Sequence, residues 1–152
     1  MVGIVVVSHS RRLAEGVAEL ATQMTQGKAK LAIAAGIDDP ENPIGTDAIA
    51  VMEAIEQVHD QQGVVVLMDL GSALLSTEMA LDLIDDHVRE NVTLISAPIV
   101  EGTMAASVAY VVVHVVFQFI FGVNLYGVRP AWDVILTGPF GTARAAPLLA
   151  RI

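Results

Sequence analysis

One histidine and one aspartate follow predicted strands, where the histidine could carry a phosphoryl group and the aspartate could assist it. His9 follows a short apolar run at residues 3–7, and Asp69 follows a similar run at residues 64–68. If both runs are strands of one parallel sheet, the two side chains meet at the edge where helix N-termini and their free N–H groups converge. Those groups stabilise an anion on an imidazole ring. A carboxylate that accepts a hydrogen bond from one ring nitrogen would fix the tautomer and make the other nitrogen a better nucleophile.

Hydroxyl groups and a glycine surround this pair in the sequence. Ser10 adjoins the histidine, Thr46 lies in the loop after another apolar run, and Gly71 and Ser72 follow the aspartate closely. Each feature also has a purely structural interpretation. Thr46 and Ser72 are suitable helix N-caps, an aspartate before glycine commonly forms a turn, and a histidine at a strand end is most often a satisfied polar group. Residue types alone leave both interpretations open.

The other residues that could do chemistry are expected at the surface, and the residue types and motifs that the chain lacks exclude several kinds of site. His59 and His87 lie in polar stretches at predicted helix ends, where we expect them at the surface. One acidic cluster has the composition of a metal site but lacks the loop geometry, which favours a solvated helix end; its members are Asp82, Asp85, Asp86 and Glu90. The chain has no cysteine and no Walker or Rossmann glycine pattern, so we expect no thiolate chemistry, no metal site and no nucleotide site on those plans.

Four apolar runs predict the strands that position the candidate site. They lie at residues 3–7, 30–35, 64–68 and 92–95. The first is continuous and β-branched, which is typical of a strand buried on both faces. Helical periodicity separates the runs, and strands that alternate with crossover helices form parallel sheets with right-handed connections. We therefore predict an α/β fold: an open, mostly parallel central sheet of about four strands, with crossover helices on both faces. The pattern leaves the strand order open.

Apolar residues at helical spacing predict which helix faces are buried. The first helix is predicted to end at a left-handed Gly27 and to bury Leu13, Val17, Leu20, Ala21 and Met24. The second is predicted to be capped by Thr46 or Asp47, with the apolar positions Ile49, Met52, Ile55 and Val58. The third is predicted to be capped by Ser72, with Leu75, Met79 and Leu83 inward. A fourth helix is predicted to begin near residues 101–103.

Charge and aromatic content divide the chain into two unlike parts. Residues 1–109 hold five basic and sixteen acidic residues, whereas residues 110–152 hold three basic residues, one acidic residue and all seven aromatic residues. The net charge of −9 for the whole chain argues against a nucleic-acid or anionic-lipid surface. The N-terminal apolar run has no leading basic region, so we expect no signal peptide and a cytoplasmic location.

Six stretches, in chain order, resemble the mannose-type enzyme IIA class of the bacterial phosphoenolpyruvate:sugar phosphotransferase system. Within that class they are most similar to the phosphocarrier subunits of phosphotransferase-dependent dihydroxyacetone kinases. They include VVVSHS at residues 5–10 and LMDLGSALLS at residues 67–76, and the full set is residues 4–10, 13–17, 33–40, 43–48, 67–76 and 97–103. The resemblance ends near residue 107 and implies an enzyme IIA-like phosphocarrier domain at residues 1–107.

The resemblance implies roles for the site residues. His9 would accept a phosphoryl group from the phosphohistidine of HPr, with phosphoenolpyruvate as the ultimate donor, and Asp69 would orient and activate it. The residues that would frame the phosphoryl site are Ser10, Thr46, Gly71 and Ser72. The resemblance also implies a homodimer.

The resemblance also implies where the phosphoryl group goes. It would pass to a nucleotide on the L subunit of the kinase, which phosphorylates dihydroxyacetone bound to the K subunit. The chain would then need no cofactor of its own, because ADP or ATP and Mg²⁺ belong to the L subunit. Two alternatives stay open: an enzyme IIA component of a mannose-family sugar transporter, and a non-catalytic regulatory or membrane-associated module. The stretch at residues 36–40 favours the kinase.

Residues 108–152 form an atypical apolar segment. No residue from 102 to 128 carries a formal charge, which meets the length of a membrane span, although His114, Gln118 and Asn124 count against one. Three interpretations compete: an out-of-frame translation product, a genuine hydrophobic extension that serves as an anchor or partner surface, and a fifth strand at the sheet edge. Membrane association is expected only under the second.

Overall fold

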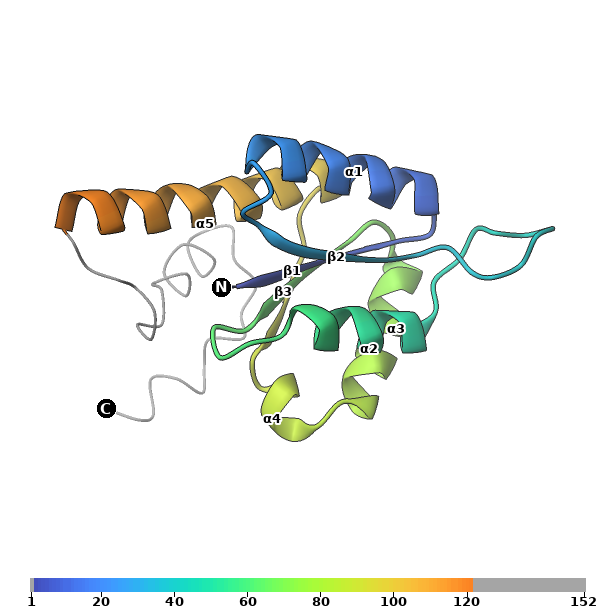
Figure 1. Ribbon diagram of the computed structural model, residues 1–152. Helices are drawn as coiled ribbons and strands as arrows, with labels where there is room; N and C mark the ends of the chain where they lie inside the picture. The colour runs from blue at the N-terminus through green and yellow to red at the C-terminus, as the bar shows by residue number, and fades with distance from the viewer. Residues whose placement is uncertain (1, 122–152) are drawn as a thin grey trace.

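Four parallel strands form the central sheet of the protein, which a computed structural model describes over residues 2–121. The strands are β1 (Gly3–Ser8), β2 (Lys30–Ala35), β3 (Val64–Met68) and β4 (Val92–Ile95). Their order in the sheet is β2-β1-β3-β4 (Figure 1). The predicted parallel sheet is confirmed, and the strand order places the ends of β1 and β3 side by side.

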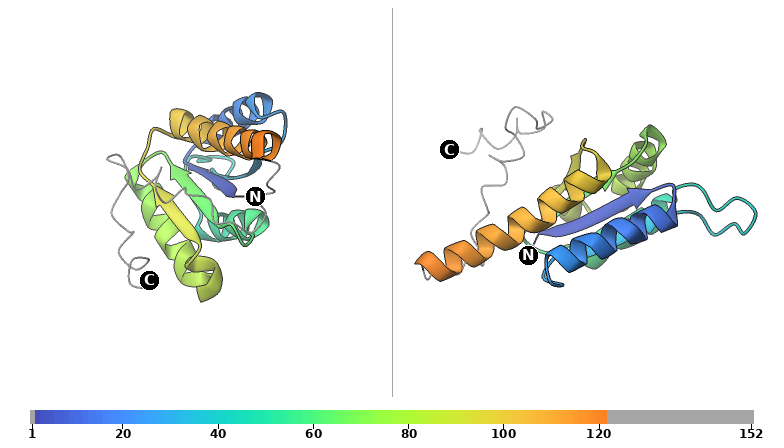
Figure 2. Two further views of the ribbon diagram at one scale, coloured as in Figure 1. Left: turned by 90° about the vertical axis from the view of Figure 1, so that its left-hand side faces the viewer. Right: turned by 90° about the horizontal axis from the view of Figure 1, so that it is seen from above.

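Helices cover both faces of this sheet. On one face lie α1 (Arg11–Met24) and α5 (Ile99–Phe121), and on the other face lie α2 (Ala48–Val58) and α3 (Gly71–Leu83) (Figures 1 and 2). A short helix, α4 (Asp86–Arg89), precedes β4. The predicted crossover helices on both faces are confirmed. Because all four strands run in the same direction, the loops that follow them meet at one edge of the sheet.

The strand β1 runs through the centre of the core. All of its side chains are buried, and successive ones point to opposite faces of the sheet. Val5 and Val7 belong to the apolar cluster that includes Ile55 of α2, whereas Val6 belongs to the cluster that includes Val17 of α1. Packing on both faces holds the end of β1, and with it the residues that follow, in a defined position.

The faces that α3 and α1 turn to the core carry mainly small residues, which corrects the prediction from periodicity. The buried residues of α3 are Ala73, Thr77, Ala80 and Leu81. Leu75, Met79 and Leu83 were predicted to point inward, but they are 62%, 62% and 59% exposed. Small side chains allow a helix to approach a sheet closely, so the large residues at the same spacing occupy the outer face.

The burial predicted for α1 and α2 is confirmed in part. In α1 the predicted burial of Val17 and Ala21 is confirmed, but the prediction was wrong for Leu13, Leu20 and Met24, which are exposed. Gly27 has the predicted left-handed φ, 71°. In α2 the burial of Ile55 and Val58 is confirmed and Met52 packs at the margin of the core, whereas Ile49 is 55% exposed.

The three helix starts near the sheet edge differ in their caps. Ser10 caps α1, because its Oγ accepts a hydrogen bond from the N–H of Leu13. Asp47, rather than Thr46, caps α2 through the N–H of Ile49. No side chain caps α3, so the predicted capping role of Ser72 was wrong. Ser72 is instead the second residue of this helix, and its hydroxyl is free for another partner.

The last helix begins slightly earlier than predicted and continues into the atypical segment. α5 starts at Ile99 and ends at Phe121, so residues 108–121 extend a helix rather than add a strand (Figure 2). Where the structure describes both backbone and side chains, no helix is long and apolar enough to cross a membrane. The three interpretations of residues 108–152 stay predictions for residues 122–152, which lie outside the described part of the chain.

Candidate functional site

His9 and Asp69 lie beside each other because the strands that precede them are neighbours. In the parallel pairing of β1 with β3, Val7 is opposite Met68, so the next residues leave the sheet at adjacent points. The Nδ1 atom of His9 is 2.9 Å from Oδ1 of Asp69. Both side chains are largely covered, with 17% and 12% of their surface exposed. The sheet thus brings together two of the predicted site residues that are 60 positions apart.

Four hydrogen-bond donors hold the Asp69 carboxylate. Oδ2 accepts from the hydroxyl of Ser8 at 2.8 Å and from the backbone N–H of His9 at 2.9 Å. Oδ1 accepts from the N–H of Leu70 at 2.7 Å and faces the His9 ring. Burial acts to raise the pKa of Asp69, but the hydrogen bonds from the His9 ring, Ser8 and the two backbone groups together hold it below its usual value. Asp69 is therefore ionised at neutral pH.

The ionised Asp69 determines which ring nitrogen of His9 is nucleophilic. A carboxylate only accepts hydrogen bonds, so the facing Nδ1 carries the hydrogen. In the neutral ring the lone pair then lies on Nε2. Bond formation at Nε2 would leave the ring positively charged, and the carboxylate beside Nδ1 would stabilise that charge. The arrangement suits a histidine that reacts through Nε2.

Nε2 of His9 faces the N-terminus of α3. It lies 2.5 Å from Oγ of Ser72, and the hydroxyl is the donor when Nε2 holds the lone pair. Ser72 itself is exposed, and no side chain caps α3. The first N–H groups of a helix have no intrahelical partner and bind anions, and the helix dipole adds to the attraction. An anionic group on Nε2 would therefore lie against the start of α3.

The loop that precedes α2 adjoins the site from another side. The N–H of Gly45 donates to the backbone carbonyl of His9 at 3.0 Å. Thr46 shares a 2.7 Å hydrogen bond with Ser76 of α3. This loop is thereby tied to the histidine and to the helix that carries Ser72. The structure places Thr46 next to the site, with its hydroxyl on Ser76 rather than on the imidazole.

Ser10 and Gly71, the other predicted framing residues, occupy the starts of two helices. Besides capping α1, Ser10 donates its backbone N–H to Oγ of Ser8 at 3.1 Å. A Cβ atom built on Gly71 would meet nothing within 4 Å, so the space over the first residue of α3 is open. Ser10 thus supports the group that holds Asp69, and Gly71 leaves room above α3.

Ser8 is a site residue that the sequence pattern did not predict. This side chain is fully buried, and its hydroxyl links the N–H of Ser10 to the carboxylate of Asp69. The signal that could have found it is a polar residue at the end of an otherwise apolar strand, directly before the histidine. Ser76 was missed as well, because only the tertiary structure shows that it faces Thr46.

The remaining candidate groups contribute nothing to this edge. His59 is the C-cap of α2 and is half-buried, so its predicted surface position is confirmed only in part; its covered Nε2 atom has no hydrogen-bond partner among the described residues. His87 is exposed as predicted, with its ring edge-to-face to His59 at 6.3 Å. Asp82 of the acidic cluster pairs with Arg89 at 2.9 Å. Among the side chains that the structure describes, no three or more His, Asp or Glu residues are arranged to hold a metal ion.

Comparison with known proteins assigns the family. The family model described as "PTS system fructose IIA component" (EIIA-man) matches residues 3–118, which is most of the chain. The chain belongs to this enzyme IIA family. The resemblance drawn from six sequence stretches is therefore confirmed.

Several relatives of this enzyme IIA chain carry the name DhaM. The "PEP-dependent dihydroxyacetone kinase, phosphoryl donor subunit DhaM" of Escherichia coli (strain K12) is 61% identical over 110 residues, which are 72% of this chain and 23% of the relative. The protein of the same name from Klebsiella michiganensis is 62% identical, with the same coverage. In Listeria innocua serovar 6a, "PEP-dependent dihydroxyacetone kinase 2, phosphoryl donor subunit DhaM" is 35% identical over 108 residues, 71% of this chain and 85% of the relative. The chain therefore spans less than a quarter of the first two relatives and most of the third.

The fold of the enzyme IIA chain also matches a solved structure. The crystal structure of a protein of unknown function, EF1359, is 28% identical, with a TM-score of 0.62. The match covers 74% of this chain and 85% of that one. The α/β architecture is thus shared over nearly the whole of the solved protein.

Proposed function

We propose that this chain carries a phosphoryl group on Nε2 of His9, accepted from phospho-HPr and passed to the nucleotide of a dihydroxyacetone kinase L subunit. The observation that carries the proposal is the pairing of His9 Nδ1 with the ionised Asp69, which leaves the Nε2 lone pair facing the uncapped start of α3. A phosphocarrier needs a nucleophile at the surface and donors for the phosphoryl oxygens, and this edge offers both.

The two transfers balance without an external acid or base. In the first, the Nε2 lone pair attacks the phosphorus of phospho-HPr, the N–P bond of the donor histidine breaks, and its electron pair returns to the donor ring. In the second, a terminal phosphate oxygen of ADP on the L subunit attacks the phosphorus. The Nε2–P bond then breaks and its electron pair returns to Nε2. Asp69 keeps the hydrogen on Nδ1 throughout and stabilises the positive ring of the intermediate.

Ser72 has a role in each state of the histidine. Before transfer its hydroxyl donates to the lone pair of Nε2. Once a phosphoryl group occupies Nε2, the hydroxyl turns to a phosphoryl oxygen, and the N–H groups at the start of α3 donate to the others. The open space over Gly71 accommodates that group. No cofactor on this chain enters either step, because the nucleotide and Mg²⁺ are assigned to the L subunit.

The kinase partner is supported by the names of the relatives. Proteins 61% and 35% identical to the chain are phosphoryl donor subunits of dihydroxyacetone kinases. We therefore assign the L subunit, acting with the K subunit that binds dihydroxyacetone, as the acceptor. We also assign HPr as the donor, a homodimer as the working form and the cytoplasm as the location.

Phosphoryl labelling tests the proposal directly. Incubation of the chain with radiolabelled phosphoenolpyruvate, enzyme I and HPr should give one acid-labile, base-stable phosphate per chain. His9→Ala should abolish the label. His87→Ala is the matched control: this histidine is exposed and lies in α4, so its replacement should leave labelling unchanged. A His9→Ala protein that labels as fully as the unaltered chain would rule out His9 as the acceptor.

A chase experiment then identifies the acceptor. Addition of ADP-loaded L subunit with K subunit and dihydroxyacetone should remove the label from the chain and produce dihydroxyacetone phosphate. Label that stays on the chain with the kinase, but moves to the IIB domain of a mannose-family transporter, would replace the kinase with a sugar transporter as the acceptor.

A further inference from the structure

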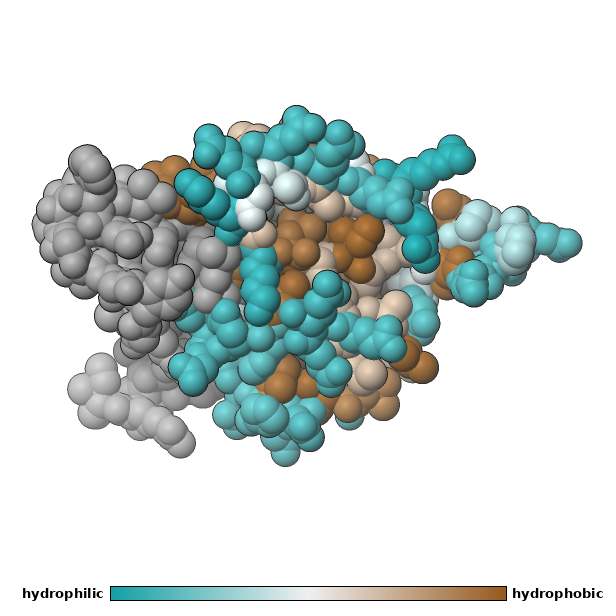
Figure 3. Space-filling view, in the orientation of Figure 1, coloured by the Kyte–Doolittle hydropathy of each residue, from teal (hydrophilic) through white to brown (hydrophobic). Residues whose placement is uncertain are grey.

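Among the side chains that the structure describes, the most exposed large apolar ones lie on α2, α3 and the loops that precede them. Six such side chains are more than half exposed: Ile44 (65%), Ile49 (55%), Leu70 (62%), Leu75 (62%), Met79 (62%) and Leu83 (59%). We name these six the α2–α3 apolar face. Figure 3 shows hydrophobic residues at the lower right of the molecule, where Figure 1 places these helices. Isolated exposed apolar residues are ordinary, but a group on one face marks an interaction surface.

This face begins at the reactive histidine. Ser72, which touches Nε2 of His9, lies three residues before Leu75, and Met79 and Leu83 follow at intervals of four, so the four side chains form one stripe along α3. The stripe runs about 16 Å from Ser72, at roughly 1.5 Å per residue. The Thr46–Ser76 hydrogen bond ties the start of α2, with Ile49, to the same part of α3. A protein that reaches His9 therefore also meets the stripe.

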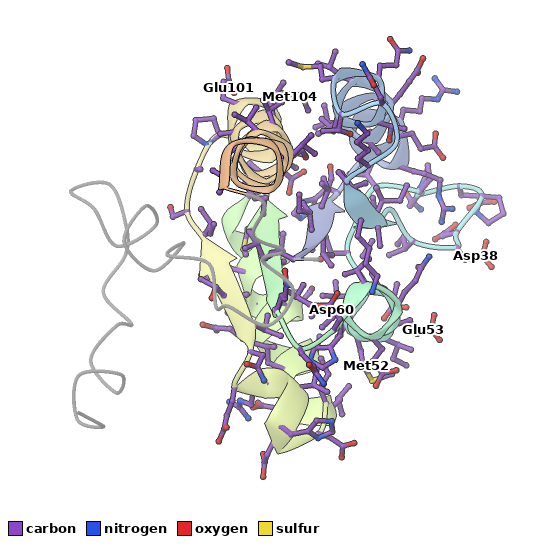
Figure 4. All side chains as sticks on the ribbon, turned by 60° about the vertical axis from the view of Figure 1, so that its left-hand side comes forward. Asp38, Met52, Glu53, Asp60, Glu101 and Met104 are labelled. Carbon is purple, nitrogen blue, oxygen red and sulfur yellow. The ribbon has the colours of Figure 1, made fainter. Side chains whose placement is uncertain are left out.

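The charges on these two helices are all negative. α2 carries Glu53 and Glu56, α3 carries Glu78 and Asp82, and neither helix has a basic residue. Figure 4 shows Glu53 projecting from α2 away from the sheet. Arg89 of α4 offsets one of these charges through its ion pair with Asp82. The apolar centre thus has an acidic margin, which complements aliphatic side chains bordered by lysine or arginine.

We propose that the α2–α3 apolar face docks the protein that delivers the phosphoryl group, through a partner surface of aliphatic side chains bordered by basic ones. The inference rests on the proposed function, since it names where the donor of that reaction binds. A second copy of the chain fits this face less well, because pairing through it would bring acidic margins together without basic partners on either pair of helices. An anionic membrane is disfavoured for the same reason.

Replacement of methionine by lysine on two helices provides a matched test. Met79→Lys puts a positive charge in the apolar face, whereas Met24→Lys makes the same change at a 54% exposed position of α1. Each variant is phosphorylated by phospho-HPr and, separately, by phosphoramidate, a small donor that needs no docking surface. For Met79→Lys we expect the KM for phospho-HPr to rise about tenfold, as for one of the few interface residues that carry much of the binding energy, with the phosphoramidate rate unchanged. Met24→Lys should match the unaltered chain with both donors.

The acidic margin is tested by a second pair of variants. Glu53→Lys on α2 should raise the KM for phospho-HPr and weaken its dependence on salt. Glu15→Lys on α1 should change neither. Equal KM values for Met79→Lys and Met24→Lys would overturn the proposal. So would loss of phosphoramidate labelling in both Met79→Lys and Leu83→Lys, because the face would then support the site itself.

Two further measurements distinguish a donor-docking surface from a dimer interface and from a failure of the proposed function. Sedimentation of the unaltered chain and of Met79→Lys should give the same mass, whereas dissociation of a dimer by the substitution would assign the face to a second copy and overturn the proposal. If neither phospho-HPr nor phosphoramidate labels His9 in the unaltered chain, the proposed function fails. If His9 is labelled normally but substitutions in the α2–α3 apolar face leave the KM for phospho-HPr unchanged, only the docking proposal is refuted.

Discussion

At the scale of single residues, Ser8 supports the site without touching the reactive nitrogen. Its hydroxyl accepts the N–H of Ser10 and donates to Asp69, and the same carboxylate accepts the hydrogen bond of the His9 ring. Ser8 thus holds one oxygen of the Asp69 carboxylate, and the other oxygen faces the ring of His9. The low pKa of Asp69 follows in part from Ser8, so a buried hydroxyl one residue before His9 helps to hold the carboxylate that faces the ring.

Removal of this hydroxyl should alter the site before it alters the fold. We expect Ser8→Ala to raise the pKa of Asp69 towards its usual value, since one hydrogen bond that favours the carboxylate is lost, and to slow labelling by phosphoramidate. The cost in stability should be about 1–3 kcal/mol, the range for a buried hydrogen bond to a charged group. NMR titration of the Asp69 carboxyl carbon and a urea denaturation curve measure the two effects.

The chain contains a matched control for this substitution. Ser107 is as fully buried as Ser8, but its hydroxyl has no partner within the part of the chain that the structure describes. Ser107→Ala should leave the Asp69 titration and the labelling rate unchanged, while Ser8→Thr should retain both because it keeps the hydroxyl. An Asp69 titration that is identical in Ser8→Ala and Ser107→Ala would refute the role given to Ser8.

At the scale of the elements, close packing of helices on the sheet decides which residues are buried. α5 shows this most clearly at Gly102, where an added Cβ would collide with Cδ2 of Leu67 and lie 3.1 Å from Cβ of Ala97. α1 approaches the sheet through Ala14, Val17 and Ala21. The large apolar residues excluded from these contacts remain outside, and on α3 they become the α2–α3 apolar face.

Two helical glycines should respond in opposite ways to alanine. Gly102→Ala should destabilise the protein by roughly 1–3 kcal/mol, because overpacking forces Leu67 or the helix to move. Gly16→Ala, on the exposed side of α1 with nothing within 4 Å of the new Cβ, should stabilise it by about 0.5–1 kcal/mol through helix propensity. Urea denaturation of both variants measures the difference, and a stabilising Gly102→Ala would contradict the described packing of α5.

At the scale of the whole molecule, the fold separates support from reaction. The sheet packs against α1 and α5 on one face and against α2 and α3 on the other. This packing fixes the ends of β1 and β3. The reactive groups all leave the sheet at that one edge, and the loop at residues 36–47, which carries Asp38 in Figure 4, lies at the same edge. The rigid sheet therefore positions the histidine, while the surface beside it stays open to partners.

Acid should destabilise the whole molecule partly through this site. The pKa of Asp69 in the folded protein lies below its ordinary value of 3.8, so its contribution to stability is fully present above pH 3.8 and is lost as the pH falls through the folded pKa. The Asp69→Asn variant lacks that contribution. Between pH 5 and pH 2, about three units that span the titration of Asp69, the free energy of unfolding of the variant should therefore fall less than that of the unaltered chain. Urea curves at each pH measure this, and parallel declines for both proteins would refute it.

The sequence was sufficient for the strands, the parallel sheet and the family because these depend on local patterns. A buried parallel strand is a continuous apolar run, and all four were predicted within one residue of their observed ends. His9 and Asp69 could be singled out because polar residues directly after such runs must lie at the functional edge. The stretches around them also carried the resemblance to the enzyme IIA family, which the family model confirms.

The tertiary structure alone decided which partner each polar group has and which face each helix buries. Ser72 was predicted both as a cap and as a residue that frames the phosphoryl site; it caps nothing and contacts His9. Thr46 pairs with Ser76. Strand order and helix packing set both distances. Periodicity identified an apolar stripe on α3 but assigned it to the core. A helix with small residues on one side and large ones on the other can bury either side, and the limited space between α3 and the sheet selects the small side. Leu75, Met79 and Leu83 are left at the surface beside the histidine for that reason.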